Sequence, residues 1–397
     1  MRGVTVPDPG EDFTADPVEL FFDLSYVFAF AQLVFFLAHH PTWADAGRTL
    51  LLFSLIWLTW TQFTWSANAV SGNARPVRLW FLAATVAAVP MGASVSGAWG
   101  PGGLPFVLSQ VVILAMGLLT MIVGMPRDSE ARPAIIRYAM PNFLAMAVLL
   151  VGVLFDGGAR VAIWAVALLP VGYAMFRAGE TNEENWIVRP GHFAERHGLI
   201  LIVALGEVVV ASGLGVADLI GDLGDELTAV PTASYVALGV AALLAALLWF
   251  SYFDRAQGLF EHRAEELQGA LKGRFARDVW SLWHLPIVAG VITVAAALEE
   301  VTLHPTDPLP LAFRLLFAGG LVLFLGGTVG AVRRAAGVLV TERLVGIAAM
   351  VGLVLVLDRV DGVVLAALVD VLLLGLLLAE ERHPRHAPDA AVGQSVS

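Results

Sequence analysis

Residues 197–214 read HGLILIVALGEVVVASGL, eighteen positions in which Glu207 is the one acidic residue. A run of this length and apolarity fits the roughly 20 residues that an α-helix needs to cross a bilayer core of roughly 30 Å. The whole chain shares this character, because it is 58% hydrophobic and 14% charged, whereas soluble domains carry about 25% charged residues. The sequence therefore predicts an all-α polytopic membrane protein that has the lipid bilayer as its partner.

Apolar runs between charged or Pro- and Gly-containing breaks predict about twelve transmembrane helices. They lie near 20–38, 49–66, 78–98, 104–124, 135–155, 161–177, 197–214, 233–252, 279–298, 311–330, 341–357 and 361–379. The last two are short and are separated by 358–361 alone, so their crossing is the least secure part of the count.

The basic residues predict the orientation of these spans. If the N-terminus is inside, 19 of the 23 Lys and Arg residues fall on inner segments, and the outer loops hold Arg48, Arg160, Arg314 and Arg359. Enrichment of Lys and Arg on the cytoplasmic side is the rule for membrane proteins. We therefore expect a multi-pass protein of the cell membrane with its N- and C-termini in the cytoplasm.

The chain also has the pattern of an internal duplication. When Glu19 is placed over Glu195, two apolar helices align, with Gln32 thirteen positions on in the first and Glu207 twelve positions on in the second. WLTWTQ at 57–62 similarly resembles WFSYFD at 249–254. The sequence predicts two six-helix repeats of the same orientation, since six crossings return the chain to the side on which it began.

These patterns divide the chain into four parts. Residues 1–17 form a cytoplasmic segment without the features of a cleaved signal peptide, 18–178 the first repeat, 179–380 the second, and 381–397 a disordered tail. Within the second repeat, apolar residues at helical spacing predict a cytoplasmic amphipathic helix near 254–278, on the membrane face or against the bundle. The Gly pairs at 319–320 and 326–327 are typical of close helix packing.

The first span opens with DPVELFFDL at 16–24. Asp16, Pro17 and Glu19 have the pattern of a helix start with a capping box, which is the structural alternative to a functional role for Glu19. Asp23 lies one turn deeper on the same face. A carboxylate facing lipid is costly, so Asp23 is expected to face the bundle, find a partner and act as an inner-gate acid.

Glu207 is the stronger candidate, because it lies near the middle of a predicted span. An ionisable group at that depth marks a functional site by default, and the alternative is a protonated Glu in a static hydrogen bond between helices. We expect Glu207 to be the titrating or cation-binding carboxylate and Gln32 to be a neutral ligand beside the same path. Glu195 and His284 are further candidates, His284 either as a proton relay or as a satisfied residue at a helix end.

Several classes of chemistry are excluded or disfavoured. The chain has no Cys, and its formal net charge of −11 argues against a nucleic-acid binder. His192 and His197 are five positions apart and do not share a helical face, so neither a metal nor another cofactor is predicted. No nucleophile–base pair appears, and we expect the protein not to be an enzyme.

Two motifs carry a resemblance to a known family. ELFFDL at 19–24, with its following aromatic residues and Gln32, and HFAERHGL at 192–199, continuing to Glu207, resemble motifs of the bacterial low temperature requirement protein A family. The likeness covers roughly residues 15–380, and it departs at His197, where an aromatic residue is more usual. The resemblance implies the architecture and no reaction, because the family's activity is not established.

Function is expected from the acidic residues within the spans. They favour a transporter or channel that moves a small solute or cation between helices one and seven and is coupled to protons through Glu207. The alternative is a membrane sensor or scaffold in which the same acids lock helices together. The sequence leaves open the substrate, the coupling ion and whether the chain forms a homo-oligomer.

Overall fold

The computed structural model describes residues 15–68, 75–123, 132–177, 188–223 and 232–382, and this part of the chain is almost entirely helical. The α-helices are α1 (Pro17–His39), α2 (Trp43–Ala67), α3 (Arg75–Ala93), α4 (Gly103–Val123), α5 (Arg132–Gly152), α6 (Gly157–Arg177), α7 (Pro190–Leu223), α8 (Thr232–Phe253), α9 (Ala256–Glu266), α10 (Gly269–Ala276), α11 (His284–Leu303), α12 (Leu311–Ala336), α13 (Thr341–Val356) and α14 (Gly362–Arg382). A π-helix, η2 (Arg277–Trp283), leads into α11.

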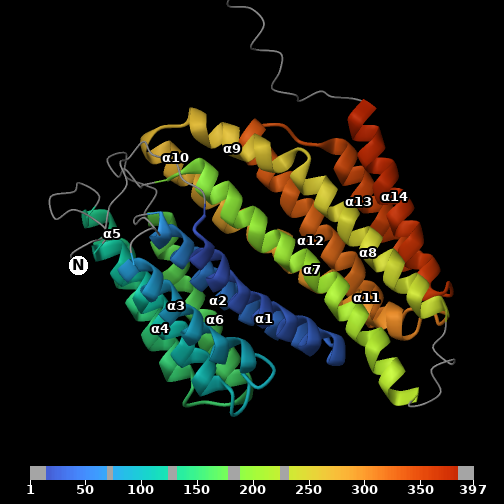
Figure 1. Ribbon diagram of the computed structural model, residues 1–397, viewed down its shortest axis with the longest axis horizontal. Helices are drawn as coiled ribbons and strands as arrows, with labels where there is room; N and C mark the ends of the chain where they lie inside the picture. The colour runs from blue at the N-terminus through green and yellow to red at the C-terminus, as the bar shows by residue number, and fades with distance from the viewer. Residues whose placement is uncertain (1–14, 69–74, 124–131, 178–187, 224–231, 383–397) are drawn as a thin grey trace, which may run out of the picture.

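The long helices form one bundle with two ends (Figure 1). We call the end that carries α9, α10 and the starts of α1 and α7 the α9 end, and the opposite one the far end. Helices α1 and α7 run side by side in the middle of the bundle, in the same direction. Helices α2–α6 lie on the α1 side of this pair, and α8 and α11–α14 lie on the α7 side.

Ten helical segments of the described chain are long and apolar enough to cross a membrane. They include all but two of the twelve predicted spans, and those two are α2 and α13. The chain is therefore an all-α polytopic membrane protein, as its composition predicts.

Helix α2 is less apolar than the ten segments because it carries several polar side chains, and these pair with α4. The hydroxyl of Thr59 donates to Gln110, the Gln62 amide donates to the Leu114 carbonyl oxygen at 2.9 Å, and Ser66 donates to the Gly117 carbonyl oxygen at 2.9 Å. Inside a bilayer, such groups must find partners in the protein. The polar stripe of α2 is thus internal, and most of the helix is buried.

Helix α13 has 16 residues, which at 1.5 Å per residue span roughly 24 Å. It nevertheless extends from the α9 end of the bundle to the far end (Figure 1). At the far end, the segment after α13 pairs with the segment before α12, where Gly362 donates to the Asp307 carbonyl oxygen at 2.9 Å and Val363 donates to that of Pro305 at 3.1 Å.

The two halves have similar helix neighbours. In the first, α1 packs against α2 and α3, α3 against α4, α4 against α5, α5 against α6, and α2 against α6. In the second, α7 packs against α8 and α11, α11 against α12, α12 against α13, α13 against α14, and α8 against α14. Numbered as spans within each half, these six pairings are the same, whereas the α2–α4 pairing of the first half has no comparable counterpart between α8 and α12.

The segment 254–278 differs from the single amphipathic helix that the sequence predicts. It forms α9 and α10, which meet at Leu267 and Gln268 and cover the α9 end of the bundle (Figure 1). Phe260 and Phe275 are fully buried, whereas Leu271 is 55% exposed. The apolar stripe therefore packs against the bundle, and the break after Glu266 turns Leu271 away from it.

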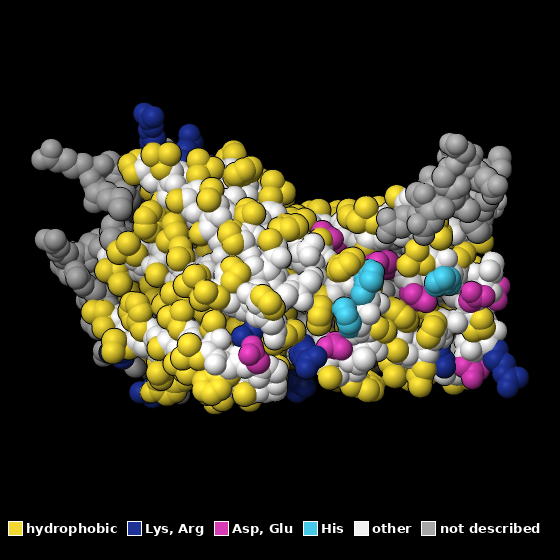
Figure 2. Space-filling view, turned by 90° about the horizontal axis from the view of Figure 1, so that it is seen from below, with side chains coloured by type: hydrophobic (Ala, Val, Ile, Leu, Met, Phe, Trp, Pro, Cys, Tyr) yellow, Lys and Arg dark blue, Asp and Glu magenta, His cyan; other side chains and the backbone are white. Residues whose placement is uncertain are grey.

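Two further segments need comment. Helix α7 continues to Leu223, nine residues past the end of the span predicted at 197–214. The predicted disordered tail lies almost entirely outside the described residues, as does most of the segment 1–17. In the view from below, hydrophobic side chains cover most of the left part of the surface, while most of the visible Asp, Glu and His side chains lie across the middle and the right (Figure 2).

Candidate functional site

The start of α1 is fixed by the predicted capping box. Asp16 is the N-cap, its side chain accepts from the Val18 amide at 3.0 Å, and Pro17 is the first helical residue. Glu19 returns the bond, accepting from the Asp16 amide at 3.5 Å through Oε1. This geometry confirms the predicted capping box and leaves the second oxygen of Glu19, Oε2, free for another partner.

That oxygen faces α7. Oε2 of Glu19 accepts from Nη1 of Arg196 and lies 2.9 Å from Nε2 of His192. Arg196 and His192 are one turn apart on α7 and are fully buried, as is Glu19 at 1% exposure. The first turns of the two central helices are therefore joined by an ion pair that is closed to solvent.

Arg196 also binds the second acid of α1. Its Nη2 donates to Asp23 Oδ1 at 2.6 Å, and its Nε donates to Asp23 Oδ2 at 3.1 Å, a two-pronged arrangement. The indole of Trp60 on α2 donates to Asp23 Oδ1 at 2.7 Å, and its ring lies 5.8 Å from the Arg196 guanidinium carbon. We call Glu19, Asp23, Trp60, His192 and Arg196 the Arg196 cluster.

The cluster holds two carboxylates and one permanent cation in a water-excluded space. Such charges are costly to bury, and they are tolerated because nearly every polar atom is paired. The structure thus gives Asp23 the inward orientation and the partner that the sequence predicts.

Beside the cluster lies a layer of aromatic side chains and histidines. Nδ1 of His197 is 2.9 Å from the Phe193 carbonyl oxygen, so Nδ1 carries the proton, and Nε2 has no partner among the described residues. The imidazole of His197 lies edge-on to that of His284, with ring centroids 5.2 Å apart. The side chains around His197 are Trp57, Trp60, Phe193, Trp280 and His284.

His284 is satisfied on both sides. Its Nδ1 is 2.8 Å from the Val279 carbonyl oxygen in the π-helix η2, and the Tyr252 hydroxyl is 2.6 Å from Nε2. The carbonyl oxygen can only accept, so Nδ1 donates and Nε2 accepts from the tyrosine. His284 therefore belongs to the aromatic layer, next to the Arg196 cluster.

Glu207 lies farther along the same helix. Eleven residues separate it from Arg196, which is about three turns and roughly 16 Å, so both side chains point to the same face of α7. The residue is 3% exposed, and the described part of the chain offers its carboxylate no hydrogen bond or ion pair. Glu207 is thus an unpaired acid well inside the bundle, on the face that binds α1 at Arg196.

The remaining predicted residues are placed elsewhere. Gln32 is half-buried and points away from the Glu19 face of α1, where Ser96 donates to its Oε1 at 3.3 Å. Glu195 accepts from the Ala15 amide at 2.6 Å and so binds the segment that precedes α1. The structure brings Glu19 and Asp23 together, sets Glu207 three turns away, and does not bring Gln32 to either.

Sequence reasoning did not assign Trp60 and His192 to this site, and it missed Arg196, which holds the two acids together. Its signal was present, because two acids four residues apart on one helix face need a cation, and Arg196 lies in the second motif. The pairing spans 173 positions, and helical spacing within one segment cannot show it. Of the described residues, none form a cluster of three or more His, Asp or Glu side chains that would hold a metal ion.

Comparison with known proteins places the chain in a family. The sequence model of the bacterial low temperature requirement A protein family matches residues 14–378, which include the Arg196 cluster, the aromatic layer and Glu207. The uncharacterized protein RA0937 of Rhizobium meliloti (strain 1021) is 27% identical over 363 residues, covering 90% of this chain and 86% of that protein. No solved structure matches the chain. Because the family model spans nearly the whole sequence, the protein belongs to the bacterial low temperature requirement A family.

Proposed function

We propose that this protein is a transporter or channel for a small solute or cation, with its path along the interface of α1 and α7. The observation that carries the proposal is the Arg196 cluster, a buried set of charges between the two central helices of a membrane bundle. Charged groups within membrane proteins are rare, face the interior and mark the routes of ions and substrates.

The cluster has the composition of a gate. Replacing a buried ion pair by apolar residues is often neutral or stabilising, so stability alone does not account for Glu19, Asp23 and Arg196. When α1 and α7 separate at their first turns, water can hydrate each charge, which offsets the loss of the pairing. The bonded arrangement would then be the closed state of the α9 end.

Glu207 supplies the binding element beyond this gate. Its carboxylate is buried, unpaired and on the same face of α7 as Arg196. A carboxylate in that position can hold a proton when the path is empty and exchange it for a cation, which would couple transport to protons. His284 is a relay candidate only through the aromatic layer, because it lies beside the cluster and not beside Glu207.

The direction of the gate follows from the charges at the two ends. The described Lys and Arg residues gather at the α9 end, and Arg48, Arg160, Arg314 and Arg359 are those at the far end. The positive-inside rule then places the α9 end and both termini in the cytoplasm of a cell membrane. On this orientation the Arg196 cluster is the inner gate, and Glu207 is reached from outside.

The shared helix pairings support an internal duplication as part of this proposal. If α1–α6 and the six long helices from α7 onward are parallel repeats, α1 and α7 are equivalent helices that face each other across the pseudo-twofold axis. Transporters built from repeats bind their substrates at the interface between them. The Arg196 cluster lies between the two first helices, as that architecture requires.

A second candidate is a membrane sensor or scaffold that moves no solute. The dense bonding of Arg196 to both acids favours it, because the same geometry would lock α1 to α7 permanently. The two functions differ at Glu207, since a lock needs no access from water to that carboxylate.

The test is a flux measurement with the purified protein in liposomes, screening protons, alkali cations and amino acids. We expect flux of at least one of them, and we expect Glu207→Gln to fold and to abolish its pH dependence. Glu265→Gln, which neutralises an exposed acid of α9, is the control and should transport like the unmodified protein. Absence of flux for every solute, or an unchanged pH profile in folded Glu207→Gln, would remove the proposed role of Glu207.

A further inference from the structure

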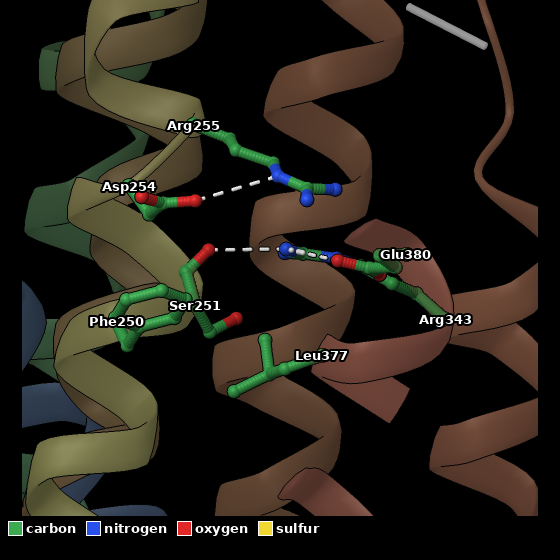
Figure 3. A pocket seen from close by; sticks show the side chains of 7 residues that line it. All are labelled: Phe250, Ser251, Asp254, Arg255, Arg343, Leu377 and Glu380. Carbon is green, nitrogen blue, oxygen red and sulfur yellow. Dashed lines mark hydrogen bonds and ion pairs between the residues drawn. The ribbon is translucent and has the colours of Figure 1, made fainter. Parts of the chain in front are cut away.

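A small pocket lies at the α9 end, apart from the α1–α7 interface, where α8, α13 and α14 meet (Figure 3). It is lined by Phe250 and Asp254 from the end of α8, by Arg255, by Arg343 from α13, and by Leu377 and Glu380 from α14. The pocket is partly open, and its volume is about 10 Å³, which is room for about one water molecule or one oxygen of a larger group.

Arg343 leaves one nitrogen without a partner at this pocket. Its Nε and Nη2 donate to the Glu380 carboxylate at 2.7 and 3.1 Å, and Nη2 also donates to the Ser251 carbonyl oxygen at 3.0 Å. Nη1 is buried and has no acceptor among the described residues. The Arg343 side chain as a whole is only 6% exposed. A buried N–H group of a cation without an acceptor is costly, so the site is incomplete as it stands.

Arg255 provides a second guanidinium at the same place. Figure 3 shows its side chain reaching from the end of α8 across the pocket, above the Arg343–Glu380 pair. Its one ion pair in the described chain is with Asp254 at 3.4 Å, and both side chains are about two-fifths exposed. Such an exposed and long pair contributes little, so Arg255 can turn to another anion at small cost.

The wall below the two arginines is formed by Phe250 and Leu377, and the helix surface around it is apolar and exposed. Phe250 is 37% exposed, and on α14 the side chains of Leu374 and Leu378, on either side of Leu377, are 46% and 44% exposed. The pocket thus combines guanidinium groups at the end of the helices with an apolar surface along them. Basic pockets between transmembrane helices have the chemistry that recognises phosphate head groups of lipids.

We propose that this pocket binds a phosphate group, with one phosphate oxygen accepting from Arg343 Nη1 and another accepting from Arg255. The lipid-facing wall favours the phosphodiester of an anionic phospholipid as the source, with its acyl chains along Phe250 and Leu377. Asp254 and Glu380 balance the charges of Arg255 and Arg343, so the pocket is formally neutral and offers N–H donors without net positive charge. This suits a singly charged diester better than a doubly charged free phosphate. The proposal is independent of whether the protein transports a solute.

The experiment uses the full chain in detergent and measures bound lipid by native mass spectrometry. Phosphatidylglycerol, phosphatidylcholine and inorganic phosphate are added in separate arms. We expect phosphatidylglycerol to bind in preference to phosphatidylcholine. Arg255→Gln should weaken the binding of phosphatidylglycerol by about tenfold, which is the usual contribution of one charge-assisted hydrogen bond to affinity. Arg263→Gln removes the same charge from an exposed side chain of α9 and should leave binding unchanged.

A second variant tests the buried arginine. Arg343→Lys keeps a cation beside Glu380 but removes Nη1, so it should lose the preference for phosphatidylglycerol while the protein stays folded; if it does not fold, the Arg255 arm still decides. Inorganic phosphate that binds in an Arg255-dependent way, without any lipid preference, would support the phosphate site and identify its source as free phosphate. Equal binding of the two lipids with no phosphate binding, or equal losses in Arg255→Gln and Arg263→Gln, would overturn the proposal.

Discussion

Arg196 holds the two acids of α1, and the cost of removing it can be stated. Without it, Glu19 and Asp23 remain buried next to each other with His192 and Trp60 as their neighbours. Two like charges in a water-excluded space repel each other, and neither can recover its hydration while α1 and α7 stay packed. The closed arrangement of the cluster therefore depends on this one side chain.

Arg196→Gln should destabilise the protein by about 3–5 kcal/mol, the usual cost of leaving a buried charge without its partner. The loss of stability is measured as a fall in the midpoint of thermal unfolding in detergent, monitored by tryptophan fluorescence. Arg263→Gln is the matched control. Because the Arg263–Glu266 pair is exposed, this substitution should leave the midpoint nearly unchanged. Equal midpoints for the two variants would show that the cluster does not hold α1 to α7.

Asp23→Asn is the milder change at the same site. The amide keeps an acceptor for Trp60 and Arg196 but removes one negative charge, so Arg196 is left with Glu19 as its one full counter-charge. We expect slower flux in liposomes with the pH dependence retained, because Glu207 is unaltered. Loss of the pH dependence in Asp23→Asn would instead move the coupling role from Glu207 to the cluster.

The residue scale also shows what sequence can and cannot predict. The capping box at Asp16 and Glu19 was predictable, since its members lie within four positions. The inward orientation of Asp23 was predictable from the cost of a charge in lipid. The identity of its partner was not, because Arg196 and Trp60 reach Asp23 through tertiary packing, and Gln32 was assigned to the path although its helical angle from Glu19 points elsewhere.

At the scale of elements, glycine decides how closely α11 and α12 approach. A Cβ atom at Gly320 would lie 2.8 Å from the Gly290 carbonyl oxygen and 2.6 Å from the Val294 side chain, and one at Gly290 would lie 2.5 Å from the Phe324 amide nitrogen. A Cβ atom at Gly319 would meet nothing within 4 Å. One glycine of the pair at 319–320 therefore serves the close packing that the sequence predicts, and the other does not.

Gly320→Ala should force α12 away from α11 and cost about 1–3 kcal/mol, as overpacking usually does. Gly319→Ala should stabilise the helix by about 0.5–1 kcal/mol, because alanine loses less backbone entropy than glycine. The unfolding midpoints of the two variants should move in opposite directions. If both fall by the same amount, the close approach of the two helices is not the reason for the glycines.

Most helices were predictable because apolar runs of this length have one stable form in a bilayer. The exceptions have physical causes. Pro286 lacks an amide hydrogen, and the π-helix Arg277–Trp283 before it widens the turn that accommodates it. The break between α9 and α10 follows no Pro, and the periodicity of the apolar residues continues across it, so the sequence pattern indicated a single helix.

The orientation of the whole molecule is open to direct labelling, since the chain has no native Cys. Gly158 at the far end and Gly258 in α9 are exposed positions where a Cβ atom meets nothing within 4 Å. An impermeant thiol reagent applied to intact cells should modify Gly158→Cys and spare Gly258→Cys. The reverse pattern would put the α9 end outside and turn the proposed inner gate into an outer one.

Because the chain has no Cys, the proposed solute path that reaches Glu207 from the far end can be probed with a single introduced thiol. The measurement is the reaction of Glu207→Cys with a small, positively charged, impermeant thiol reagent added from outside. Val209→Cys is the control, because Val209 lies at the same depth on the opposite face of α7 and is 42% exposed toward lipid. We expect modification at 207 and none at 209, and an unreactive Glu207→Cys beside a reactive Gly158→Cys would rule the path out.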